Sequence, residues 1–333
     1  MYYKYKVKKK NKHTFRHIII VLILLATGFF SYRYREHLMF WKYSDNKLIV
    51  LLKAAEANED KSIRATELKK LIPVFDEYRN TNDLTAEAFF FSARLHYAIG
   101  LTYLPGTFSE LIINDHIKEI SNSAKAEFEK AIKYMNKGVA FLGKQQVERD
   151  YLMILAYSCF YTGYLNPQEL NNIIAPINAM ELGDNIEDIR LYALLNILNK
   201  NEEAGFSLLS EKGMVETGID GILFMAGLEN MVGRSTNAIM NYKKVLGLTG
   251  DFRILKLVHV NLGKIYFSQS LFNESLEQFN AALEIDEGDI SLKIWIGRNY
   301  LSLGQADRAK KTWADALATD KNNSELKKLL GVR

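Results

Sequence analysis

Few side chains in this sequence have the types and spacing that catalysis or metal binding requires. The histidines His96, His116 and His259 are isolated from one another along the chain, and each is interpreted as a surface or core residue rather than a ligand. No glycine-rich phosphate loop, His-Glu-x-x-His zinc motif or nucleophile elbow occurs. We therefore expect no catalytic residue, no cofactor and no metal, and we interpret the chain as a protein other than an enzyme.

The cysteine and the paired acids have structural explanations. Cys159 is the only cysteine, which rules out an intramolecular disulfide and a cysteine-based zinc site. It lies in the apolar run 151–161, so we expect it to be buried as a small hydrophobic residue. Glu202 and Glu203 fall at an expected helix start, where capping and solvation account for them.

The most informative cations are Lys264 and Arg298, which occupy equivalent places 34 residues apart in a repeated pattern. The signature side chains of this pattern are small or aromatic: Gly263, Tyr266, Phe279 and Ala282 in residues 256–288, and Gly297, Tyr300, Ala309, Trp313 and Ala316 in residues 290–322. A repeat of this length with this pattern is typical of stacked helix–turn–helix units. Such arrays usually hold other molecules rather than transform them.

These two segments resemble the tetratricopeptide repeat (TPR) family at nearly every signature position. The glycines let a neighbouring helix approach, and the aromatic residues fill the space between the helices. Glu287 and Lys321 stand where the family usually has proline. The helix B spacing recurs less strongly at Ala238, Tyr242 and Val245, and at Ala124, Phe128 and Ala131. The resemblance implies an all-α, TPR-like α-solenoid of about seven helix pairs over residues 42–333.

The resemblance also implies a concave groove lined by the first helix of each pair. Its inner-face positions correspond to apolar residues around two stacked cations: Leu257, Val260, Lys264 and Phe267, followed by Ile294, Arg298 and Leu301. Such a groove suits a peptide that carries carboxylates beside apolar side chains. A solvated face whose cations balance an acidic body is the alternative. The family's clamp for a free carboxyl terminus uses asparagine where this chain has a cation, so recognition of a free terminus is not expected.

One apolar segment, residues 101–120, interrupts the rhythm of the repeats. It lies between a helix that ends near Gly100 and a helix that starts near Ser121. We interpret it as a loop with a short helix that folds back on the array. A docking lobe for a partner is the functional alternative, because lengthened loops often carry contacts.

The N-terminus is interpreted as a membrane signal anchor. Residues 1–16 form a basic leader, and residues 17–41 contain the uncharged apolar run 18–30 followed by further aromatic residues. A positive region followed by an apolar run is typical of an export signal or an anchor. Ala26 and Gly28 offer a weak cleavage site, but the apolar residues beyond it favour an uncleaved transmembrane helix.

Charge predicts the orientation of that helix and excludes one class of partner. The chain has a net charge of +4, but most of the excess lies in the leader, and the body from residue 38 onward is mildly acidic. Because the more cationic flank stays in the cytoplasm, we expect the N-terminus inside and the repeat domain in the periplasm of a double-membrane bacterium. A basic stripe for nucleic acid is missing from the body, so no nucleic-acid partner is expected.

The sequence therefore predicts a single-pass inner-membrane scaffold that mediates protein–protein interactions and assembles an envelope complex. Repeat proteins of this plan resemble assembly factors of bacterial envelope machines, including the periplasmic flagellar collar of spirochaetes. A peptide-binding or chaperone-like module for exported clients is the main alternative, and an enzyme whose repeats only serve a catalytic partner is a third. No small-molecule substrate is expected.

Overall fold

The computed structural model describes residues 45–82, 85–142, 147–163, 166–178, 185–211 and 218–332. Within these ranges every regular element is a helix. The predicted leader, residues 1–16, and the predicted anchor, residues 17–41, lie outside the described residues. None of the helices in the described part combines the length and the apolar character that crossing a bilayer requires.

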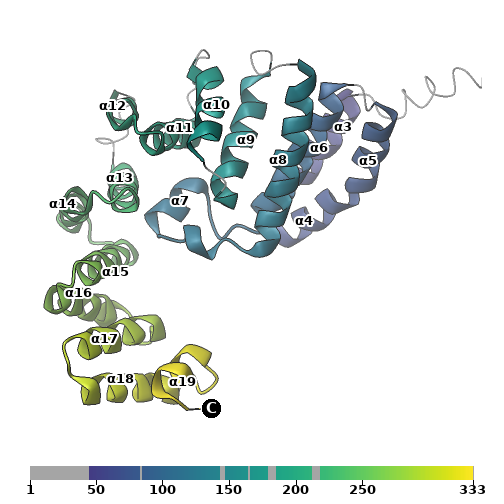
Figure 1. The fold of residues 1–333 in the computed structure, drawn as a ribbon. Coiled ribbons are helices and arrows are strands. Elements are labelled where there is room, and N and C mark those ends of the chain that lie inside the picture. Colours follow the sequence, from purple (N-terminus) through teal and green to yellow (C-terminus); the bar gives the residue numbers. More distant parts are fainter. Residues whose placement is uncertain are drawn as a thin grey trace, which may run out of the picture.

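The helices follow one another as antiparallel pairs that form an open hook (Figure 1). The pairs are α6 (Ala86–Thr102) with α8 (Asn122–Leu142), α9 (Arg149–Thr162) with α10 (Pro167–Asn178), α11 (Ile186–Leu198) with α12 (Glu202–Glu211), α13 (Ile219–Met231) with α14 (Ser235–Leu246), α15 (Phe252–Ser268) with α16 (Phe272–Ile285), and α17 (Ile290–Ser302) with α18 (Ala306–Thr319). The short helix α19 (Ser324–Leu330) ends the array. With the N-terminal helices, the described part contains the seven predicted pairs, so the all-helical solenoid is confirmed.

The sequence predicts one helix pair over residues 44–80, divided at Glu59 and Asp60, but the structure has three helices there. Helix α3 (Asp45–Glu56) is followed by α4 (Lys61–Lys70), and the side chain of Asp60 caps α4 by accepting hydrogen bonds from the amides of Ser62 and Ile63. A further helix, α5 (Ile72–Thr81), follows directly after its cap residue Leu71 and has Pro73 in its first turn. Proline favours a helix start because it lacks the N–H that the helix interior would need. The predicted second helix is therefore divided in two.

The repeat signature packs as its residue types predict. A Cβ atom on Gly263 would lie 2.9 Å from the ring of Phe279, and one on Gly297 would lie 2.1 Å from the indole nitrogen of Trp313. In each repeat the aromatic ring of the second helix thus rests on the glycine of the first. Trp313 also donates a hydrogen bond from Nε1 to the carbonyl oxygen of Ile294, at 3.2 Å. The small residues Ala282, Ala309 and Ala316 are fully buried beside these rings.

Candidate functional site

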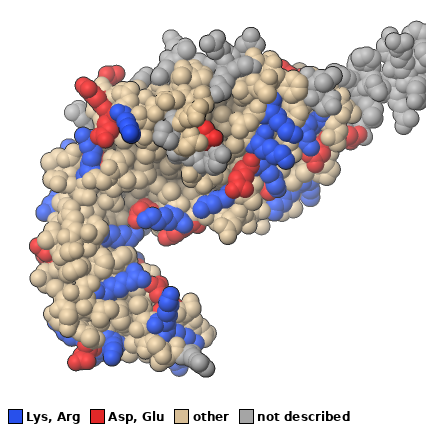
Figure 2. All heavy atoms as spheres, viewed as in Figure 1, with Lys and Arg blue, Asp and Glu red and all other residues tan. Residues whose placement is uncertain are grey.

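The predicted groove residues lie on α15 and α17, in the C-terminal arm of the hook. Figure 2 shows a hollow between this arm and the rest of the molecule, with Lys and Arg side chains on both sides of it. Leu301 is 51% exposed, whereas Leu257, Val260 and Phe267 are half-buried. Ile294 is buried against Trp313 and Leu326, so its side chain belongs to the core and offers no surface to a partner.

Both predicted groove cations already have partners within the chain. The Nζ atom of Lys264 lies 3.5 Å from Oδ2 of Asp115, which belongs to the 101–120 segment. The guanidinium of Arg298 lies 2.5 Å from Glu325 on α19 and stacks over the ring of Trp295. A partner would have to compete with these two acids, and binding of a partner by Lys264 and Arg298 stays a prediction. A charge reversal at Lys264 would also disturb the segment that contains Asp115.

The 101–120 segment occupies part of the inner face. It forms the short helix α7 (Phe108–Ile113) and a 3₁₀ turn, η1 (Ile117–Glu119), and it folds back on the array as predicted. Its apolar side chains are buried in the main core: Phe108, Leu111, Ile112 and Ile113. We call residues 101–120 the inner segment. Because this segment is buried in the array, it is a built-in part of the fold rather than a free docking lobe.

Polar contacts from two helix pairs, α11/α12 and α15/α16, hold the inner segment in place. Asn261 on α15 is 3% exposed and donates a hydrogen bond from Nδ2 to the carbonyl oxygen of Ile113, at 2.9 Å. On α11, Glu187 accepts a hydrogen bond from the amide of Ser109, and Arg190 donates one to the Ser109 hydroxyl. Buried polar groups that are paired in this way specify a single arrangement.

A glycine on α13 gives the inner segment its closest approach to the array. A Cβ atom on Gly227 would lie 2.7 Å from the carbonyl oxygen of Ile112. Gly227 precedes Lys264 by 37 residues, the same offset that relates the matching helix B residues Tyr242 and Phe279. Lys264 and Arg298 occupy this position in the two clearest repeats. The equivalent residue on α13 is a glycine, which leaves room for the inner segment. Gly227, Arg190 and Asn261 were not predicted from the sequence, although aligned repeats show that position 227 lacks the cation.

A cavity lies in the N-terminal half, beside the inner segment. It has a volume of about 540 Å³ and is lined by α4, α6, α9, the inner segment and the start of α11. Aromatic side chains that line it include Tyr97, Phe108, Tyr157 and Tyr161. Lys61 and Arg64 line it from α4. The sequence analysis did not find this cavity because its walls come from five separate parts of the chain.

Two charged groups of this cavity, Asp188 and Lys61, differ in how many of their hydrogen-bonding atoms already have a partner. Asp188 accepts hydrogen bonds from Arg149 and from the Tyr157 hydroxyl, at 2.7 and 3.0 Å. Burial raises the pKa of Asp188 even though these two partners lower it. Lys61 donates one hydrogen bond to the carbonyl oxygen of Leu104, at 2.9 Å. Because an ammonium group has three donors, Lys61 keeps two for a ligand, whereas both oxygens of Asp188 are occupied.

The remaining candidate groups take structural roles. His96 is buried and lies 2.7 Å from Glu127, and His259 lies 2.9 Å from Gln278. Cys159 is buried, as predicted, and burial raises the pKa of its thiol to about 12. A thiol with such a pKa stays protonated at neutral pH and is a poor nucleophile.

With the fold and the inner face described, the comparison with known families is informative for the C-terminal arm. Residues 266–332 match a family model described as tetratricopeptide repeat. This match covers helices α16 to α19, and the earlier pairs have the same helix-pair arrangement. No curated protein sequence gave a match.

Solved structures with a similar arrangement share little sequence with this chain. One is the APC/C hetero-tetramer Cut9–Hcn1, at 14% identity and a TM-score of 0.40, where the match covers 86% of this chain and 51% of that chain. Another is the MamA protein, at 17% identity and a TM-score of 0.31, covering 65% and 94%. A third is the human IFIT1 dimer with PPP-AAAA, at 15% identity and a TM-score of 0.35, covering 82% and 67%. This chain spans about half the length of the Cut9–Hcn1 chain that it matches. Likeness at this level carries no conclusion about function.

Proposed function

We propose that this chain is a membrane-anchored TPR scaffold that binds partner proteins on its inner face and assembles a bacterial envelope complex. The observation that supports this proposal is the cavity of about 540 Å³, in which tyrosine rings lie near a lysine with unused donors. A partner segment with a carboxylate for Lys61 and apolar side chains for the tyrosines fits this lining. The periplasmic flagellar collar is the particular complex that the plan of the chain resembles.

Site-specific photo-crosslinking in the native cells tests where the partner binds. A photoreactive amino acid replaces Pro105, an exposed residue in the lining of the cavity, Leu301 on the inner face of the arm, or Met240. Met240 is 64% exposed on α14, the second helix of its pair, and serves as the matched control. We expect a protein crosslink from Pro105 or Leu301 and none from Met240. Equal crosslinking from Met240, or none from both inner positions, would contradict binding on the inner face.

The same crosslinks distinguish the two classes of function. A scaffold gives one partner in a fixed ratio to this chain, and that result would support assembly of a defined complex. A chaperone-like module for exported clients gives many partners of different sizes. Mass spectrometry of the crosslinked bands therefore decides between the two.

The proposed anchor and orientation have their own test. A phosphatase that is active only after export, fused after Arg333, should be active because the cationic leader keeps the N-terminus in the cytoplasm. Replacing Lys6, Lys8, Lys9, Lys10 and Lys12 with glutamine should reduce that activity. The control replaces five lysines of the C-terminal arm, which are too far from the span to direct its insertion. An inactive fusion would reverse the proposed orientation.

A further inference from the structure

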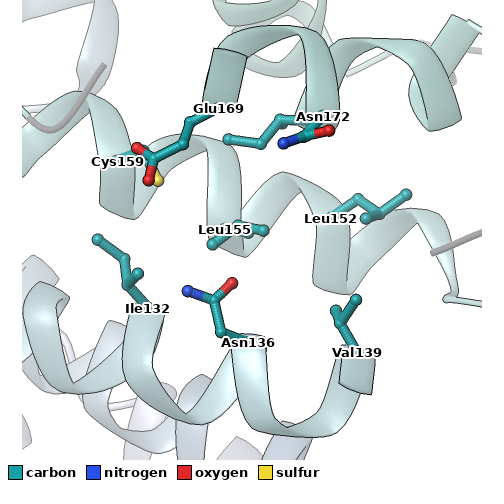
Figure 3. A pocket seen from close by; sticks show the side chains of 9 residues that line it. Ile132, Asn136, Val139, Leu152, Leu155, Cys159, Glu169 and Asn172 are labelled. Carbon is teal, nitrogen blue, oxygen red and sulfur yellow. The ribbon is translucent and has the colours of Figure 1, made fainter. Parts of the chain in front are cut away.

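A second cavity lies between α8, α9 and α10, and nothing in the proposed function uses it (Figure 3). Its volume is about 180 Å³. Its apolar walls include Val139 on α8 and Leu155 on α9, and the sulfur of Cys159 also lines it. The polar side chains in the lining are Asn136, Glu169 and Asn172. The lining is thus mostly apolar, with one acid, two amides and no basic residue.

Glu169 is the unusual member of this lining. It lies in the first turn of α10, where its amide donates to the side chain of Asn166 at 2.8 Å. The Oε2 atom of its side chain is buried and has no hydrogen-bond partner. Figure 3 shows this carboxylate beside the sulfur of Cys159. A buried carboxylate oxygen without a partner is costly, so a group that donates hydrogen bonds to it would stabilise the fold.

The two amides in the lining also have unused hydrogen-bonding capacity. The side chains of Asn136 and Asn172 line the cavity, and neither takes part in a hydrogen bond within the described residues. Figure 3 shows that Asn136 points from α8 toward α9, into the gap. Both asparagines are exposed, so their amides lie at the open side of the cavity, whereas Oε2 of Glu169 is buried. The lining therefore suits a group that donates hydrogen bonds to Glu169 and carries an apolar chain.

We propose that this cavity binds a small primary alkylammonium ion, with its ammonium group on Glu169 and its alkyl chain against Val139 and Leu155. An ammonium has three N–H donors, so it can donate one hydrogen bond to Glu169 Oε2 and keep the others for water at the open side of the cavity. Because one water takes up about 30 Å³, a cavity of this volume holds roughly six non-hydrogen atoms. That size fits an amine with four or five carbons.

Calorimetric titration of the full chain in lipid nanodiscs tests the proposal. The probes are n-butylammonium chloride, n-butanol and sodium butyrate, with empty nanodiscs as the blank. The variant Glu169→Gln keeps the shape of the side chain and removes its charge. Glu203→Gln is the matched control, because Glu203 also lies in the first turn of its helix, α12, but is exposed.

We expect n-butylammonium to bind at one site in the wild-type protein and in Glu203→Gln, and to bind about tenfold more weakly or less in Glu169→Gln. Butanol and butyrate should bind at least about tenfold more weakly than butylammonium to the wild-type protein. If Glu169→Gln does not fold, the three probes on the wild-type protein still decide. Equal affinity for butanol would mean that water satisfies Glu169 in an apolar cavity, and would overturn the proposal. The absence of saturable butylammonium binding, or equal binding to folded Glu169→Gln, would also overturn it.

Discussion

The variant Gly297→Leu is expected to lose about 1–3 kcal/mol of stability in the C-terminal repeats. Even the first carbon of the new side chain would lie 2.1 Å from Nε1 of Trp313, and the indole ring has little freedom to move. Trp313 is 3% exposed and is held by its hydrogen bond to the carbonyl oxygen of Ile294. Hydrogen exchange of α17 and α18 should therefore become roughly tenfold faster or more, since about 1.4 kcal/mol corresponds to a factor of ten.

Two companion variants show whether the ring contact is the cause. Gly250→Leu places the same side chain where a Cβ atom would have no neighbour within 4 Å, and should leave exchange in α17 nearly unchanged. In the Trp313→Leu variant, changing Gly297 to alanine should lower the free energy of unfolding by less than the same change does in the wild-type protein. The reason is that the ring that a Cβ atom on residue 297 would meet is then absent. Unchanged exchange in Gly297→Leu would show that the stacking of α17 on α18 is wrong.

The second large effect is expected from Gly227→Leu, which should displace the inner segment. The new side chain would occupy the place of the Ile112 carbonyl, whose oxygen lies 2.7 Å from the Cβ position. Displacement exposes apolar side chains that are now buried, and each contributes about 1.5–3 kcal/mol when it is fully buried. The loss of two or more of them should cost on the order of 3–6 kcal/mol. Hydrogen exchange over residues 108–120 should rise by about a hundredfold or more.

Lys264→Leu is the matched control for this variant. It places the same side chain at the equivalent position of the next repeat, where it removes only the half-exposed pair with Asp115. Such a pair contributes about 0–1 kcal/mol, so the inner segment should stay protected. If exchange of the inner segment is the same in Gly227→Leu and in the wild-type protein, the close approach at Gly227 does not hold that segment in place.

The repeats could be predicted from the sequence because their determinants are local. Gly263 with Phe279, and Gly297 with Trp313, are each separated by 16 residues and pack within a single helix pair. A regular spacing therefore translates directly into contacts. The division of the second N-terminal helix was missed because Leu68, Ile72 and Phe75 keep a helical spacing across Pro73. Pro73 is typical of a helix start, but the helical spacing of the apolar residues favoured one continuous helix.

The inner face could be predicted only in part, because its contacts join distant parts of the chain. The short helix in residues 101–120 was expected, but the hydrogen bond from Asn261 to Ile113 spans 148 residues. Periodicity says nothing about such a pair. For the same reason Lys264 was interpreted as a binding residue, although Asp115 of the inner segment lies beside it. The cavity near Lys61 and Asp188 also has walls from separate repeats, and no local pattern indicates it.

The inner segment also bears on how the array could change in length during evolution. In most solenoids each repeat contacts only its neighbours, so whole repeats can be duplicated or deleted. Here the inner segment, which connects α6 with α8, contacts α11, α13 and α15. Inserting or deleting a helix pair within this stretch would shift Arg190, Gly227 or Asn261 away from the atoms of the inner segment that they meet. The next pair, α17 and α18, makes none of these contacts, so duplications should be tolerated there, and homologous chains should vary in repeat number mainly toward the C-terminus.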